Sequence, residues 1–353
     1  MATRRGFMAS LAAALTVPRL TWADAGSPSF LAAAKRGDDF VLYGLDLRGE
    51  AVFSVPLPAR GHAAAAHPAR PEAVAFARRP GSFALVIDCA RGLVAHRLTP
   101  PGGRQFNGHG AFSEDGAVLY TSEVVAETSE GRLGIWDAAG NYARIAELPS
   151  GGIGPHELRR LPDGVLVVAN GGIRTDPGDR RKLNIDRMRP SLTYLDPQGR
   201  LLEQVDLGAE HHQLSIRHLA PGPDGEVAFA MQWEGDPAEP VPLLGLHRRG
   251  EAARLCPPDE SEAWAMQGYA GSIAWSGDRI ALTSPPGGVV HLFDGRGGFL
   301  RAIRRTDASG VAALPDGLMI TDGTGAVSRI GAEGLRPLQR FDLAWDNHLV
   351  ALG

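Results

Sequence analysis

The stretch that decides the fold runs from Gly108 to Gly140 and carries three landmarks in order: Gly108-His109-Gly110-Ala111-Phe112, Glu114-Asp115-Gly116 and Trp136-Asp137-Ala138-Ala139-Gly140. An apolar run that opens on a histidine is followed by an Asp-Gly turn, further apolar runs and an Asp-x-x-Gly turn. Aspartate suits such turns because its side chain hydrogen-bonds nearby backbone, and glycine accepts positive φ. The stretch therefore predicts short strands joined by tight turns.

The same landmarks recur along the chain. The second turn appears seven times, with substitutes for aspartate in two copies: Asp46 to Gly49, Asp88 to Gly92, Asp137 to Gly140, Asp196 to Gly199, His247 to Gly250, Asp294 to Gly297 and Gly331 to Gly334. The units are expected to start at His62, His109, His156, His218, about Ser272, about Ser309 and His348. The first two spacings are each 47 residues (109 − 62 and 156 − 109). Four-strand units of about 40–50 residues predict a β-propeller.

The two ends of the chain complete one another. After His348 only five residues remain, whereas residues 30–31, 39–45 and 51–57 match the second, third and fourth strands of a unit. Pairing the C-terminal strand with these N-terminal strands closes the ring and leaves no free sheet edge. We therefore expect an all-β, seven-bladed β-propeller that forms a single domain over residues 26–353.

The N-terminus carries the marks of an export signal. Thr3-Arg4-Arg5-Gly6-Phe7-Met8 is followed by a small apolar run from Ala9 to Val17, and Ala23-Asp24-Ala25 offers a cleavage site. A paired arginine before such a run is typical of twin-arginine export. We expect residues 1–25 to be this signal and the mature protein to be periplasmic. The apolar run is too short to span a bilayer stably.

Composition narrows the class of protein further. The chain has 353 residues, 45 of them Gly and 26 Pro, and a net charge of −4. A net charge of this size and sign gives no electrostatic argument for binding nucleic acid. Two cysteines, Cys89 and Cys256, fall in units several blades apart and are expected to be unpaired.

Five histidines open consecutive units counted around the predicted ring. Since the first strand of each blade is innermost, their side chains are expected to converge on the central channel. Neutral imidazole is a good ligand for iron, copper, nickel and zinc. The predicted metal ligands are His62, His109, His156, His218 and His348, with His212 and Glu157 as additional candidates. Arg104 and Arg217 are candidates for contacts with an anion or ligand.

Two other interpretations of the histidines remain open. In one large class of propellers, a Gly-His pair is structural and bonds within its own blade, and a Trp-Asp pair closes the repeat. Gly108-His109 followed by Trp136-Asp137 matches that pattern once, while the other units do not. An anion or organic ligand site is the other alternative. A long basic insertion between Asn170 and Leu192 is expected to be a surface loop over one face, and loops of that length are often functional.

These distributed motifs resemble a known family. Asn107-Gly108-His109-Gly110, Gly154-Pro155-His156-Glu157-Leu158, Asn170-Gly171-Gly172-Ile173, Lys182-Leu183-Asn184, Pro190-Ser191-Leu192 and residues 212–218 resemble the domain of unknown function 1513 family. That family is similar to quinoprotein amine dehydrogenase-like and nitrous oxide reductase-like propellers. Its gene neighbourhood, with imelysin-like and di-haem peroxidase-like proteins, implies a role in iron uptake. Thr175-Asp176-Pro177 departs from the His-Pro more typical there.

The expected function follows from these observations together. We expect a periplasmic metal-binding accessory protein that handles iron, with iron preferred through the resemblance and copper or zinc also compatible with imidazole ligands. Its expected partners are the imelysin-like and di-haem peroxidase-like proteins. The alternatives are a metal-dependent enzyme, either a lactonase-like hydrolase or an oxidoreductase, and a scaffold for protein interactions. No common hydrolase, phosphate-binding or Cys-x-x-Cys motif is present in the sequence.

Overall fold

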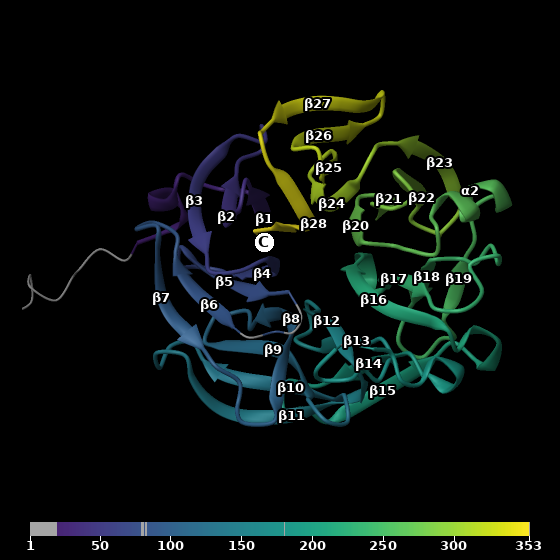
Figure 1. Ribbon diagram of the computed structural model, residues 1–353, viewed down its shortest axis with the longest axis horizontal. Coiled ribbons are helices and arrows are strands. Elements are labelled where there is room, and N and C mark those ends of the chain that lie inside the picture. The colour runs from purple at the N-terminus through teal and green to yellow at the C-terminus, as the bar shows by residue number, and fades with distance from the viewer. Residues whose placement is uncertain (1–19, 79–80, 82, 180, 353) are drawn as a thin grey trace, which may run out of the picture.

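The structure is a computed structural model that describes residues 20–78, 81, 83–179 and 181–352. Within these residues the strands form seven four-stranded antiparallel sheets arranged as a ring (Figure 1). The expected all-β seven-bladed propeller is thereby confirmed. Among the described residues, no helix is both long and apolar enough to cross a membrane.

Each of the first three blades is built from four consecutive strands, the first of which is innermost. Blade 1 contains β4 (Gly61–Ala66), β5 (Glu72–Ala77), β6 (Ala84–Asp88) and β7 (Leu93–Leu98). Blade 2 contains β8 (Arg104–Phe112), β9 (Val118–Val125), β10 (Glu130–Asp137) and β11 (Ala143–Ile153). Blade 3 contains β12 (Pro155–Arg160), β13 (Leu166–Asn170), β14 (Ser191–Leu195) and β15 (Leu201–Asp206).

The next three blades repeat the pattern. Blade 4 contains β16 (Leu214–Pro221), β17 (Val227–Trp233), β18 (Leu244–His247) and β19 (Arg254–Cys256). Blade 5 contains β20 (Ser272–Ser276), β21 (Arg279–Ser284), β22 (Val289–Asp294) and β23 (Phe299–Arg304). Blade 6 contains β24 (Ala308–Leu314), β25 (Gly317–Asp322), β26 (Ala326–Gly331) and β27 (Gly334–Arg340). The predicted unit starts thus fall on or within innermost strands.

Blade 7 joins the two ends of the chain. Its strands are β28 (Ala344–Ala351), β1 (Phe30–Arg36), β2 (Asp39–Leu45) and β3 (Ala51–Leu57), and β28 pairs antiparallel with β1. This confirms the predicted closure of the ring. Short helices occupy some connections: η1 (Trp22–Ala25), η2 (Ile185–Arg187), η3 (Ala209–His211), η4 (Pro223–Gly225) and α2 (Glu260–Ala265).

The repeated Asp-x-x-Gly turns form as the sequence predicts. Asp46 accepts backbone hydrogen bonds from Arg48 and Glu50 through Oδ1, at 2.9 Å each, and Gly49 has φ +74°. Equivalent turns form at Asp196 and Asp294. Each turn fixes the register between the third and fourth strands of its blade.

The core lies between neighbouring blades. Phe76, Tyr194, Phe229 and Phe293 are buried there, and burying one such ring stabilises the fold by about 1.5–3 kcal/mol. Both cysteines are buried and unpaired, as expected. The predicted export signal lies outside the described residues except for 20–25. Of these, Trp22 donates a hydrogen bond from its indole nitrogen to the His67 carbonyl at 2.9 Å, and the cleavage site stays a prediction.

Candidate metal centre

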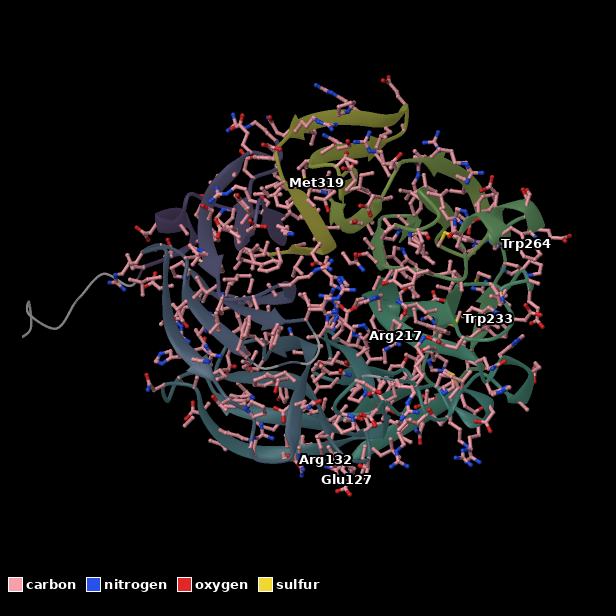
Figure 2. The ribbon with its side chains drawn as sticks, in the orientation of Figure 1. Glu127, Arg132, Arg217, Trp233, Trp264 and Met319 are labelled. Atoms are coloured by element: carbon pink, nitrogen blue, oxygen red, sulfur yellow. The ribbon has the colours of Figure 1, made fainter. Side chains whose placement is uncertain are left out.

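The five predicted histidines meet at the axis of the ring. Ring centroids of His62 and His348 lie 4.5 Å apart, those of His109 and His156 4.8 Å, and those of His218 and His348 4.7 Å. These imidazoles come from five blades that follow one another around the propeller. Figure 2 shows nitrogen-bearing side chains gathered at the centre, with Arg217 beside them on the side of β16.

A repeated irregularity of the innermost strands places these rings. The register with the neighbouring strand shifts between Gly61 and Ala64, between Phe106 and Gly110, between Pro155 and Leu158 and between Ile216 and His218. The pairing of β1 with β28 shifts in the same way near His348. A β-bulge bends its strand and re-aims a side chain. Each axial histidine therefore lies in or at the edge of a bulge.

Two groups of three histidines have the spacing of metal ligands. They are His62, His109 and His348, and His109, His156 and His218, and within each group the candidate nitrogen atoms lie within 4.8 Å of one another. Metal–imidazole bonds of about 2.0–2.1 Å put donors around one ion roughly 3–4 Å apart. The upper limit of 4.8 Å for either group is within about 1 Å of that spacing. His109 belongs to both groups.

The electrostatics keep these imidazoles in the form that binds metals. Burial lowers the pKa of His109, His156 and His348 well below the ordinary value, and the neighbouring histidines lower each pKa further. Nε2 of His109, Nδ1 of His156 and Nε2 of His348 have no hydrogen-bond partner among the described residues. A neutral imidazole ring whose nitrogen has no hydrogen-bond partner is able to bind a metal ion through that nitrogen.

Glu157 supports one of the rings from behind. Its Oε2 lies 3.3 Å from Nδ1 of His218 and accepts a hydrogen bond from the Leu219 backbone at 3.1 Å, while Oε1 lies 2.7 Å from Nε of Arg159. Burial raises the pKa of this carboxyl, but Arg159 and His218 outweigh burial and lower it to about 2. The charged carboxylate fixes the ring of His218 and leaves its Nε2 for the axis.

His109 does not behave as the structural histidine of a Trp-Asp repeat. The Trp136 indole donates to Thr121 Oγ1 at 2.9 Å, and only the backbone of His109 bonds to Ser122. By contrast, His247 is a structural residue, since its Nδ1 lies 2.7 Å from the Tyr194 hydroxyl. The geometry therefore favours the axial interpretation over the structural one.

The remaining candidates lie in different surroundings. His212 follows η3, bonds the Ala209 carbonyl through Nδ1 at 2.8 Å, and lines a separate cavity of about 890 Å³ with residues of the 171–192 insertion, so it does not join the axial group. Arg104 forms two hydrogen bonds of 2.9 Å to Glu147 and so already holds a carboxylate of this chain. Arg217 is buried beside the histidines, and burial lowers its pKa.

Space beside the rings is small. A cavity of about 20 Å³, enough for roughly one water molecule, is lined by His109, Glu157, Arg159, His218 and His348. Apolar residues of the innermost strands, among them Val311 and Leu349, complete its wall. Sequence reasoning missed Arg159, because its contact with Glu157 depends on the position of β12 relative to the axis. Alternating residues share a strand face, and that was the only available signal.

Comparison with known proteins agrees with this architecture. A family model described as "Protein of unknown function (DUF1513)" matches residues 55–352. None of the curated proteins matches the chain. Among solved structures, hydrazine synthase of Kuenenia stuttgartiensis aligns with a TM-score of 0.60 at 15% identity, covering 93% of this chain and 98% of that one. A streptogramin B lyase aligns with a TM-score of 0.56 at 12% identity, covering 80% and 84%. At such identities the likeness concerns the fold alone.

Proposed function

The chain belongs to the DUF1513 family, whose function is unknown, and on that premise we propose that its axial histidines bind a transition-metal ion. The observation that carries the proposal is the convergence of His62, His109, His156, His218 and His348 from five blades, with ligand atoms within 4.8 Å in each group. The packing of a propeller core does not require five imidazole rings in contact. Apolar side chains would fill that space at lower cost than buried polar rings.

The donor set indicates which ions fit. Imidazole nitrogen suits iron, copper and zinc, whereas magnesium and calcium prefer oxygen ligands. Burial lowers the pKa of His109, His156 and His348 and keeps these three rings neutral. Glu157 holds His218 by the carboxylate–histidine arrangement common behind metal ligands. Iron remains our preferred cargo, since the family resemblance implies iron uptake; copper and zinc are the alternatives to be separated by analysis.

We place this binding in an accessory role in the periplasm, with imelysin-like and di-haem peroxidase-like proteins as partners. The pair Arg4-Arg5 and the apolar run after it support export through the twin-arginine route. The cavity beside the rings has room for about one water molecule. That favours holding and transferring an ion over turnover of an organic substrate such as a lactone.

Metal analysis of the exported protein tests the proposal. The protein should leave the periplasm with about one equivalent or more of iron, copper or zinc per chain, measured by elemental analysis. The double variant His109→Ala/His156→Ala should lose most of that metal, because it removes two ligands from one group and the shared ligand from the other.

His96→Ala is the matched control. His96 packs its ring against Tyr142 and belongs to neither group of candidate ligands, so this variant should keep the full metal content. Circular dichroism of each variant checks that the fold is intact. A double variant that folds and retains all its metal would rule out the axial site.

A further inference from the structure

A second hollow of the molecule lies apart from the axial histidines. It is the cavity of about 890 Å³ that His212 lines, and it lies between the 171–192 insertion and the connection from β15 to β16. Its volume falls within the range of about 300–1,000 Å³ that is usual for sites that bind small molecules. Neither this cavity nor the insertion takes part in the proposed metal centre.

The wall that the insertion forms is held in place from both sides. The Thr175 amide donates a hydrogen bond at 3.0 Å to Oγ of Ser129, in the connection between β9 and β10. On the other side, Lys182 forms an ion pair with Glu234, just beyond the end of β17. Within the insertion, Asn184 accepts one backbone hydrogen bond at 2.7 Å and donates another at 2.9 Å. A wall that is already ordered costs a ligand little conformational entropy on binding.

Apolar side chains supply part of the lining. Leu183 and Leu207 line the cavity together with Met188 and Pro190. Met188 and Pro190 are buried, whereas Leu183 is 38% exposed although it is a large apolar residue. Covering such a surface removes it from water, which is favourable. The lining therefore favours a ligand that has an apolar body.

Three arginines border the same cavity. Arg174, Arg187 and Arg189 line it, and all three are exposed. The ion pairs of the insertion are formed by Arg181 and Lys182, and neither Arg187 nor Arg189 forms one with a described residue. A single exposed arginine without a partner is ordinary, because water solvates it. Several of them beside one apolar lining are the kind of polar groups that orient a ligand in a small-molecule site.

The acidic residues of the lining do not neutralise these arginines. Asp186 and Asp206 also line the cavity, and neither carboxylate forms an ion pair within the part of the chain that the structure describes. Asp206 instead accepts a hydrogen bond from the Gly208 amide at 3.0 Å. Three arginines against two aspartates leave the lining with an excess of one positive charge, before His212 is counted. Since a guanidinium binds both oxygens of a carboxylate in parallel, the lining favours an anion.

We propose that this cavity binds a small organic anion with an apolar body. Arg187 and Arg189 hold its carboxylate, and Leu183 and Leu207 cover its apolar part. None of the five axial histidines lines the cavity, so this binding is a second function beside the proposed one and needs no metal ion.

Three probes separate the contributions of charge and apolar surface. Naphthalene-2-carboxylate has both, naphthalene-2-carboxamide has the same apolar body without the charge, and acetate has the charge alone. Equilibrium dialysis against the purified protein at neutral pH measures each dissociation constant. We expect the naphthoate to bind about tenfold or more tightly than the amide, because the amide loses charge-assisted hydrogen bonds. It should also bind about tenfold or more tightly than acetate, which buries little apolar surface.

Arginine variants locate the carboxylate of the probe. Arg187→Met/Arg189→Met should lower the affinity for naphthoate to that for the amide and leave the affinity for the amide unchanged. Arg301→Met/Arg336→Met is the matched control, since it removes two exposed arginines of the outer strands β23 and β27, which likewise form no ion pair with a described residue. The control should bind naphthoate as the wild type does. Circular dichroism checks that both variants fold.

A leucine variant locates the apolar part. Leu183→Asn should weaken the binding of naphthoate and of the amide alike by several-fold, because both lose an apolar contact. Leu300→Asn replaces an exposed leucine of β23 and should change neither affinity. Equal affinity of the wild-type protein for naphthoate and the amide, or no binding of either, would overturn the inference. So would an Arg187→Met/Arg189→Met variant that binds naphthoate as tightly as its control. Failure of the metal site would leave all these results unchanged.

Discussion

At the scale of single residues, the charge on Glu157 determines which nitrogen of His218 carries the proton. The carboxylate is buried, yet Arg159 and His218 hold its pKa at about 2, so it is charged at neutral pH. A charged oxygen facing Nδ1 of His218 selects the tautomer with the proton on that nitrogen. Nε2 is then left as the acceptor, which is the form that donates electrons to a metal.

Replacing Glu157 by Gln should weaken metal binding about 10–100-fold, the range seen when partners behind metal ligands are removed. The neutral amide keeps the shape but no longer stabilises the proton on His218. Competition titration with a chelator measures the effect. Glu114→Gln is a suitable control, since Glu114 pairs only with Arg160 at the surface. Unchanged affinity in the Glu157 variant would show that His218 needs no such support.

His291 makes a second prediction at this scale, concerning stability and pH. Its ring is buried beside Phe293 and Phe299, and burial lowers its pKa to about 4 although Glu262 opposes the shift. As pH falls from 6.5 to 4, the unfolded chain takes up a proton that the folded chain refuses, so the free energy of unfolding decreases. The loss attributable to this residue is about 3 kcal/mol over that window.

The variant His291→Phe should flatten this pH dependence. A phenyl ring takes up no proton in either state, so the contribution of residue 291 disappears while those of the axial histidines, which have the same sign, remain. Denaturant unfolding of both proteins between pH 7 and pH 4 measures the slopes. Parallel slopes would mean that His291 is protonated in the folded protein at the same pH as in the unfolded chain.

At the scale of strands, β-bulges in the innermost strands direct the repeated histidines towards the axis of the ring. In a regular strand, side chains alternate between two faces that pack on neighbouring blades. The register shifts around His62, His109, His156 and His218 turn these residues towards the axis instead. β20 pairs with β21 without a register shift and contributes no histidine. β24 also has a register shift, between Ala308 and Val311, but carries Ser309 there instead of a histidine. Five of the six bulged innermost strands among the described residues thus place a histidine at the axis.

Gly108 tests this association. It has φ +96°, and a Cβ at this position would collide with the ring of His62. Gly108→Ala should therefore destabilise the fold by about 1–3 kcal/mol and also reduce metal content. Gly92→Ala is the matched control, because Gly92 has φ +68° but nothing within 4 Å of its Cβ position. It should lose stability through its backbone while keeping its metal. Equal metal loss in both variants would argue against a specific role for Gly108.

The strands also show how far sequence reasoning reaches. The seven turns at Asp46, Asp88 and their counterparts have a local physical signature, so unit starts and ring closure could be predicted. Convergence of the five histidines followed from the repeat alone. The bulges and the contact of Glu157 with His218 could not be predicted, because they depend on register shifts and on neighbours from other blades. Proximity in sequence to His218 predicts that His212 lies near the axial residues, whereas η3 carries it to a different cavity.

At the scale of the whole molecule, closure of the ring and completion of the site depend on the same strand. β28 pairs with β1, buries Trp345 and Leu349, and carries His348 to the axis. Without β28, the hydrogen-bonding edge of β1 would be exposed, and such edges promote aggregation. β28 is therefore required both for a stable ring and for the full set of imidazoles.

Two variants separate these roles. Ending the chain at Leu343 removes β28, including Trp345 and Leu349, whose truncation alone would cost about 2–5 kcal/mol each. That protein should aggregate or unfold without a cooperative thermal transition. His348→Ala keeps the strand and its pairing, so its transition should remain cooperative while its metal affinity falls. Differential scanning calorimetry and metal titration compare the two. A truncated chain that melts cooperatively near the wild-type temperature would show that blade 7 is stable with three strands, because closure would then contribute little to the stability of the ring.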